Sequence, residues 1–145
     1  MSTAPAPHRL VELSGAEALW LLDGSRRGRL VYVRRGAPPV RPADAAPAVR
    51  PAAHVLEHGR LVVRTPVPAA ALAAGAAVTY QVDEGGQGGT GWSVTATGPV
   101  EVVTDPDEAA HYRRTLAGLT HGPHDTVLRL HPQTVTGFRL TGAGA

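Results

Sequence analysis

The sequence predicts a mainly β protein, a β-barrel with two or three short helices. Three observations support this fold class. Short segments in which apolar and polar residues alternate recur along the chain, hairpin-length connections separate most of them, and no strand–helix–strand repeats indicate a parallel sheet. The chain has 145 residues, of which 43% are hydrophobic, so one domain with a single core accounts for its length.

Capping residues predict the helices. The first helix, over about 14–23, begins with the capping-box spacing of Ser14 and Glu17 and ends at Gly24. The second, over about 106–117, has Asp105 as its N-cap and Pro106 at its first position. A third, short helix is expected over 68–74. We expect residues 1–9 to form a flexible tail, the first helix to be the first ordered element, and the domain to span 10–141.

Alternating segments predict the strands, and glycine and proline predict the connections between them. A hairpin turn is expected at His58-Gly59, a bend or bulge at Gly98-Pro99, a proline-rich loop insertion over 36–48 and a glycine-rich loop over 83–91. The predicted strands are 28–33, 49–57, 60–65, 77–82, 92–103, 126–131 and 135–140.

The composition restricts the chemistry. All fourteen basic residues are arginines, so an anion must be held by arginine, histidine, hydroxyls or backbone N–H groups. The formal net charge is only +2 and the arginines are dispersed, so no nucleic-acid partner is indicated. The absence of cysteine excludes disulfides, thiolate catalysis and cysteine-ligated metal. Without a signal-peptide pattern or an apolar membrane span, we expect a cytoplasmic protein with no membrane partner.

A series of ordered pieces between about 10 and 140 carries a family resemblance. The strongest pair is Gly91–Val94 (GWSV) followed by Val103–Glu108 (VTDPDE). With Val49–His54 (VRPAAH) and Val62–Thr65 (VVRT), these pieces resemble the actinobacterial branch of the pyridoxamine 5′-phosphate oxidase-like split barrels. The resemblance implies a six-stranded antiparallel Greek-key split barrel of the FMN-binding type. It also implies a homodimer that binds FMN in clefts at the dimer interface, whereas some relatives bind F420 or haem.

Arg64 and Thr65 are the predicted phosphate contacts. They end a strand just before a short helix, where a guanidinium, a hydroxyl and free N–H groups can converge on an anion. The resemblance implies that this strand end contacts the flavin phosphate. The following segment, 66–71, offers no polar side chain, so we expect a weaker hold on the phosphate than in many relatives.

Pro51 and His54 match the strand that runs beneath the flavin ring in relatives, where Ala53 replaces an amide side chain. His54 could donate to the edge of the ring, lie over the ring, or pack at the barrel edge. It is the one candidate for catalysis near the expected cleft, and it is also the candidate haem ligand.

Aromatic residues are scarce, at two Trp, three Tyr and one Phe, so an aromatic at a strand end is a candidate ligand contact. Trp92 and Ser93 begin the strand that relatives use at the flavin site, although Trp92 could instead pack in the core or in the dimer. Phe138 and Arg139 fall where classical oxidases present residues of the partner subunit to the flavin. His121 and His124 have metal-like spacing but lie in a turn, and we expect no metal there.

Two functions of different classes remain open. One is a flavin-dependent oxidoreductase acting on a small molecule, in which the cofactor carries the redox chemistry. The other is a non-catalytic protein with a degraded site that stores or senses a flavin, F420 or haem, or has no cofactor. A true pyridoxamine 5′-phosphate oxidase is not expected, because the Arg129–His131 (RLH) tripeptide does not match that enzyme's substrate motif in position.

Overall fold

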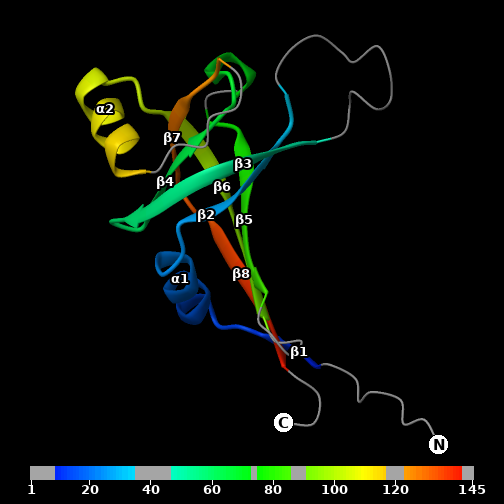
Figure 1. Ribbon diagram of the computed structural model, residues 1–145. Helices are drawn as coiled ribbons and strands as arrows, with labels where there is room; N and C mark the ends of the chain where they lie inside the picture. Colours follow the sequence, from blue (N-terminus) through cyan, green and yellow to red (C-terminus); the bar gives the residue numbers. More distant parts are fainter. Residues whose placement is uncertain (1–8, 35–46, 73–74, 86–90, 117–122, 142–145) are drawn as a thin grey trace, which may run out of the picture.

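The computed structural model of the chain describes residues 9–34, 47–72, 75–85, 91–116 and 123–141 (Figure 1). These residues form eight strands, two α-helices and one short 3₁₀-helix, η2. In chain order the elements are β1 (Arg9–Glu12), α1 (Gly15–Asp23), β2 (Arg27–Tyr32), β3 (Ala48–Glu57), β4 (Arg60–Thr65), η2 (Ala69–Ala71), β5 (Ala77–Gly85), β6 (Gly91–Val102), α2 (Pro106–Thr115), β7 (Thr126–Leu130) and β8 (Thr134–Thr141).

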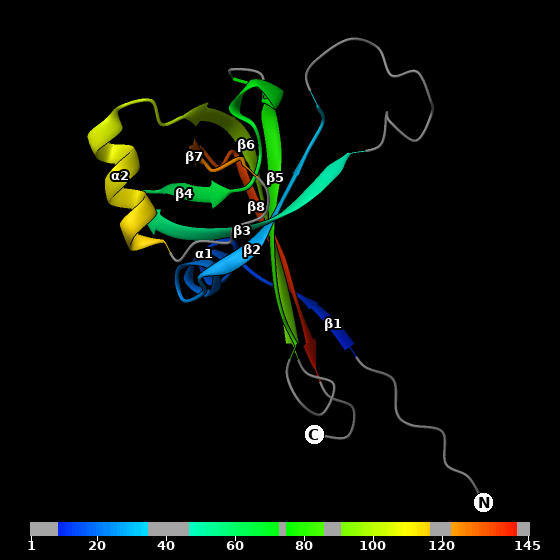
Figure 2. The same cartoon turned by 45° about the horizontal axis from the view of Figure 1, so that its top comes forward.

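The strands form one antiparallel sheet that closes on itself. Its order is β1-β8-β6-β5-β2-β3-β4-β7, and β6 pairs with β7 as well as with β5 and β8. Six strands, β6-β5-β2-β3-β4-β7, therefore make a closed barrel, which confirms the predicted fold class. The ends of β5, β6 and β8 extend beyond the barrel, and β1 pairs with this extension (Figures 1 and 2).

β6 changes partner at Gly98-Pro99. Before this point it pairs with β8, ending at Thr97↔Thr134, and after it with β7, beginning at Val100↔Leu130. The register with β5 runs unbroken from Ala77↔Pro99 to Gly85↔Gly91, so the predicted bulge is absent from that ladder. The glycine instead allows the β7–β8 turn to cross closely over β6, where a Cβ on Gly98 would lie 1.9 Å from the carbonyl oxygen of His131.

The expectation that a helix is the first ordered element was wrong, because β1 precedes α1. All four residues of β1 are exposed, so this segment has no alternating pattern that a sequence can show. It becomes a strand by pairing with β8, from Arg9↔Thr141 to Glu12↔Phe138, a partner more than 120 residues away along the chain.

The predicted caps and turns are confirmed. The Ser14 hydroxyl accepts from the Glu17 N–H at 3.1 Å, and the Asp105 carboxylate accepts from the Glu108 N–H at the same distance. The β3–β4 hairpin turns at His58 and Gly59, which both have positive φ, at 52° and 76°. The third predicted helix is reduced to η2, and β5 runs three residues further than expected, to Gly85.

Two apolar clusters make up the core. The larger fills the barrel and the space beneath α1, with Leu22, Leu30, Tyr80 and Val94 among its fully buried members. The smaller lies outside the barrel wall, where α2 covers β3, β4 and β7 (Figure 2). Its members are Ala53, Val62, Val103, Ala109, Tyr112, Leu116 and Val127.

Some expectations concern residues outside the described ranges. These are the tail over 1–8, most of the proline-rich insertion, the middle of the glycine-rich loop, and His121. Among the described helices, none is long and apolar enough to cross a membrane.

Candidate functional site

The structure divides the eight predicted site residues into two groups. Arg64 and Thr65 lie at the end of β4, beside Pro51 and His54 of β3. The other four lie on the part of the sheet that extends beyond the barrel, where Trp92 pairs with Arg139 and Ser93 with Phe138. In both overall views, β4 lies in the barrel with α2 against its outer side, and the extension points away from them (Figures 1 and 2).

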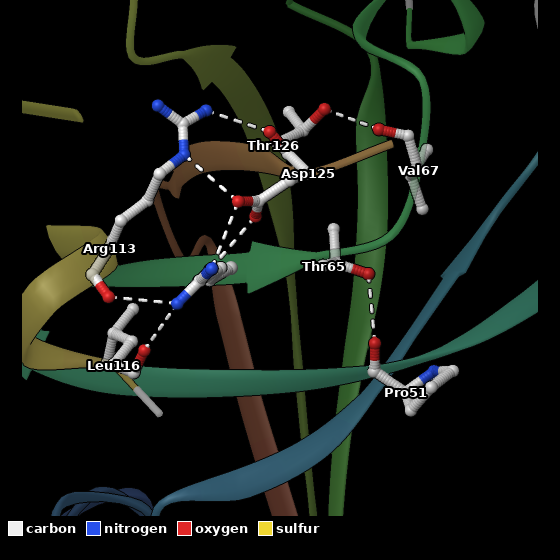
Figure 3. A network of polar contacts seen from close by, with 8 residues as sticks. Pro51, Thr65, Val67, Arg113, Leu116, Asp125 and Thr126 are labelled. Atoms are coloured by element: carbon white, nitrogen blue, oxygen red, sulfur yellow. Dashed lines mark hydrogen bonds and ion pairs between the residues drawn. The ribbon is translucent and has the colours of Figure 1, made fainter. Parts of the chain in front are cut away.

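Arg64 ties β4 to α2 and to the start of β7. Its Nε and Nη2 donate to the two carboxylate oxygens of Asp125 at 2.9 and 3.0 Å, a bidentate ion pair. Its Nη1 donates to the carbonyl oxygens of Arg113 and Leu116 at 2.9 and 2.8 Å, at the C-terminal end of α2 (Figure 3). A guanidinium has five N–H donors, and four of those of Arg64 are engaged in these bonds.

A second arginine converges on the same carboxylate. Arg113 donates from Nε to the Asp125 carboxylate at 3.2 Å and from Nη2 to its backbone oxygen at 2.8 Å. The hydrogen bond from Arg64 is the main cause that holds the pKa of Asp125 below its usual value. Two guanidiniums around one carboxylate leave the cluster with a net charge of +1, and Asp125 engages the fork of Arg64 on both of its carboxylate oxygens.

Thr65 also has a partner within the chain. Its hydroxyl donates to the carbonyl oxygen of Pro51 at 3.0 Å, and the side chain is buried (Figure 3). Thr126, its register partner, donates in the same way to the carbonyl oxygen of Val67. Together these bonds fasten the end of β4 to β3, and the segment after β4 to β7. The hydroxyl of Thr65 therefore donates to the protein rather than to a ligand.

His54 faces the barrel interior, so of the three positions that the sequence left open, its position is nearest to packing within the barrel. The side chain is fully buried. Nδ1 lies 2.5 Å from the Tyr80 hydroxyl, and Nε2 lies 3.0 Å from the Leu22 carbonyl oxygen and 3.1 Å from the Ser25 hydroxyl. A neutral ring protonated on Nε2 satisfies every one of these contacts, with Tyr80 as donor to Nδ1. Burial lowers the pKa of His54, which favours this neutral form.

The role expected for Ala53 at the flavin ring does not agree with the structure. Successive residues of a strand point to opposite faces, so Ala53 points away from the barrel interior that His54 occupies. It packs under α2 in the smaller core cluster with Val62 and Tyr112. An Ala53→Asn substitution would thus bury an amide beneath the helix rather than supply a donor to a ligand.

The second group lies on two faces of the extension. Directly opposite residues of an antiparallel pair share a face, so Trp92 and Arg139 lie on the side of α1, and Ser93 and Phe138 lie on the other side. Phe138 is 41% exposed. A hydrogen bond from Ser93 is the main cause that lowers the pKa of Asp83, which also pairs with Arg29. This face of the extension therefore combines an exposed aromatic ring with an ordered polar cluster.

Sequence reasoning missed the partners that engage the predicted residues. No sequence pattern marks Asp125 or Arg113 as a partner of Arg64. Only the fold brings these residues together. Tyr80 carried a signal that could have been used, since a phenol at an inward position of a strand needs a buried hydrogen-bond partner.

Comparison with known proteins identifies the family. The family model described as pyridoxamine 5′-phosphate oxidase matches residues 14–139. The chain belongs to this family. The match begins at the cap of α1 and ends in β8, so it includes the whole barrel and both groups of predicted site residues.

Known relatives of the chain align with nearly its whole length. An uncharacterized protein of Mycobacterium tuberculosis, Rv0080, is 35% identical over an alignment of 139 residues, which covers 90% of this chain and 86% of that protein. Among solved structures, an FAD-binding protein from Mesorhizobium loti has a TM-score of 0.69 at 23% identity, covering 93% and 99% of the two chains. The FAD-binding protein of Mycobacterium smegmatis has a TM-score of 0.60 at 24% identity, covering 92% and 98%. These two likenesses show the shared fold.

The contacts of Arg64 predict a role in stability. Replacing Arg64 by alanine removes a bidentate ion pair and two bonds to helix carbonyls, and should lower the free energy of unfolding by about 2–3 kcal/mol. Arg64→Lys keeps the charge but loses the fork, so its loss should be intermediate. Urea unfolding of the two variants and the wild type measures the difference. A lysine variant as stable as the wild type would show that the fork geometry contributes nothing.

Proposed function

We propose that this chain is a homodimeric flavin-binding protein, with FMN as its cofactor, and that it acts as a flavin-dependent oxidoreductase on a small molecule. Its membership of the pyridoxamine 5′-phosphate oxidase family supports this proposal, and so does the fold it shares with two proteins named for FAD binding. The single observation that carries the proposal is the arrangement of the predicted contacts in two groups that one subunit does not join.

A second subunit would complete such a divided site. The extension leaves apolar side chains of β1 and β8 exposed, namely Leu10, Val11 and Phe138. On the barrel, Val33 and Val49 are also exposed. Burying these residues between two copies would remove apolar surface from water, which is the usual driving force of a stable homodimer. Phe138 on one face of the extension, or Arg139 on the other face, would then face the cleft of the second copy.

The two ends of the divided site fit a flavin unequally. On one face of the extension, the indole of Trp92 and the guanidinium of Arg139 suit a planar aromatic ligand, and on the other face the exposed ring of Phe138 does so. At the other end the Arg64 fork is closed by Asp125, so a phosphate there must displace a carboxylate from two arginines. The residues present therefore fit the ring better than the phosphate.

This difference predicts that the protein binds FMN, which carries the phosphate, only slightly more tightly than riboflavin, which lacks it. Wild-type protein should bind FMN and riboflavin with affinities within about threefold of each other, because Asp125 neutralises the fork. Asp125→Asn removes the competing charge and should raise the affinity for FMN about tenfold while leaving riboflavin unchanged. Flavin fluorescence quenching measures both affinities. If wild-type protein prefers FMN by a hundredfold, the phosphate is held by other residues and the fork has no part in it.

A flavin, when bound, supplies the electron-transfer chemistry, and the protein would orient it and exclude water. Neither nitrogen of His54 is available as a general acid or base, since Tyr80, Ser25 and Leu22 occupy both. The sequestered His54 and the closed Arg64 fork favour a second candidate, a non-catalytic flavin carrier or sensor of the same fold.

Three measurements separate these functions. Light scattering should report about twice the 15.0 kDa chain mass, and a monomer would contradict the shared cleft. The visible spectrum distinguishes flavin, F420 and haem. Enzymatic turnover requires that a bound flavin be reduced by one small molecule and reoxidised by another, so a flavin that binds but does not cycle with any reductant supports the carrier.

A further inference from the structure

The two tryptophans of the chain meet in one surface pocket. Trp20 lies in the last turns of α1, and Trp92 lies near the start of β6, where α1 packs beside the extension (Figure 1). The pocket has a volume of about 380 Å³, within the range of small-molecule sites. It is lined by Trp20, Leu21, Asp23, Gly24, Glu84 and Trp92.

The charge of this pocket is negative. Asp23 and Glu84 contribute two carboxylates, and none of its described lining residues is basic. Arg26 follows Gly24 by two residues and Arg139 pairs with Trp92 across β6 and β8, but neither lines the pocket. The five residues that join β5 to β6, 86–90, carry no charged side chain in the sequence.

The end of α1 adds to this negative potential. The C-terminus of a helix carries a partial negative charge, which basic residues in the last turn usually offset. The last turn of α1 has no basic residue, and its final residue is Asp23, an acidic side chain in an unfavourable position. Breaks in the local rules of helix design are expected at functional or strained sites. A cation bound in this pocket would relieve the repulsion between Asp23 and the end of α1.

Aromatic faces and carboxylates together recognise organic cations. An ammonium group is attracted to the face of an indole, which is the strongest such partner among aromatic side chains. Trp20 is 73% exposed, a large unpartnered aromatic surface for a helix of a globular domain. An anion would be repelled by both carboxylates, and a small metal ion would gain nothing from the indoles.

We infer that this pocket binds a small organic cation, an alkylated ammonium or a protonated amine, between Trp20 and Trp92, with Asp23 and Glu84 as its counter-charges. The inference goes beyond flavin binding and does not depend on it, because the pocket lies within one subunit and repels phosphate. If a flavin also binds, the cation site would lie beside Trp92, at the ring end of the divided site.

Choline and its neutral isostere 3,3-dimethylbutan-1-ol are the probes for a direct test. Because both tryptophans line the pocket, tryptophan fluorescence reports on it without a background from tryptophans elsewhere in the chain. Choline should change the fluorescence saturably and bind at least about tenfold more tightly than the alcohol. Equal affinities for the two probes, or no saturable response to choline, would overturn the inference.

Charge variants locate the effect. Asp23→Asn combined with Glu84→Gln should weaken choline binding about tenfold and leave the alcohol unchanged. The matched control, Glu101→Gln combined with Asp107→Asn, removes the same two charges from β6 and α2, outside the pocket, and should bind choline as the wild type does. Circular dichroism and urea midpoints show that both variants fold. If the pocket and control variants lose choline affinity equally, overall charge rather than this site binds the cation.

Discussion

Replacement of Gly98 by alanine should destabilise the protein by more than about 4 kcal/mol, or prevent its folding, which is the largest effect we expect of a single methyl group. The new Cβ would lie 1.9 Å from the carbonyl oxygen of His131 and 2.8 Å from its carbonyl carbon. Both contacts are to backbone, so no side-chain rotation relieves them.

The turn that crosses Gly98 cannot easily move away. The His131 N–H donates to the Pro99 oxygen at 2.9 Å, and the Gln133 N–H donates to the Thr97 oxygen at 2.8 Å. If the turn shifted far enough to make room for a methyl group, both hydrogen bonds would break. The pairing of β6 with β8 and β7 on either side of this point would also be disrupted. Gly15→Ala is the matched control, because a Cβ there meets nothing within 4 Å and alanine suits the first turn of α1.

Soluble yield and the urea midpoint check this result. The Gly15 variant should match or slightly exceed the stability of the wild type, and the Gly98 variant should unfold far earlier or fail to accumulate. A Gly98→Ala protein with the midpoint of the wild type would mean that the β7–β8 turn does not cross β6 at this distance.

His54→Ala is the second large effect, at about 3 kcal/mol. The substitution leaves the buried Tyr80 hydroxyl without its partner and opens a cavity between the barrel and α1. His54→Gln offers one donor and one acceptor, so it should retain part of this stability. Tyr80→Phe together with His54→Gln forms a double-mutant cycle, and additive losses would contradict a direct bond between the two side chains.

The same histidine predicts a dependence of stability on pH. Burial holds the pKa of His54 below its ordinary value of about 6.5, which applies to the unfolded chain. As the pH falls below about 6.5, the unfolded chain binds a proton that the folded protein does not, so stability falls with a slope of up to about 1.4 kcal/mol per pH unit. Above this range the contribution is complete.

His54→Gln lacks this titration and provides the comparison. Urea unfolding of the wild type and the variant between pH 7.5 and pH 5 isolates His54, because every other titrating group is common to both. The wild type should lose stability more steeply than the variant. Parallel pH profiles would show that the ring is not held in its neutral form.

The sequence by itself determined those helix starts and turns that depend on residues only a few positions apart. Ser14 and Asp105 predicted both helix starts, since an N-cap bonds to an N–H only three residues away. His58-Gly59 predicted the hairpin turn, and alternation predicted the barrel strands. The family was identifiable from ordered pieces such as GWSV and VTDPDE, and the family match agrees with it.

The tertiary structure alone decided what each predicted site residue contacts. Strand position gave Arg64 and His54 as available groups, but a sequence does not show which distant residue will satisfy a polar side chain. Asp125, 61 residues from Arg64, closes its fork, and Tyr80, 26 residues from His54, occupies its ring nitrogen. β1 also depends on a distant partner, because it has no local pattern of its own and is a strand only through its pairing with β8. Each of these outcomes depends on contacts between segments that only closure of the barrel brings together.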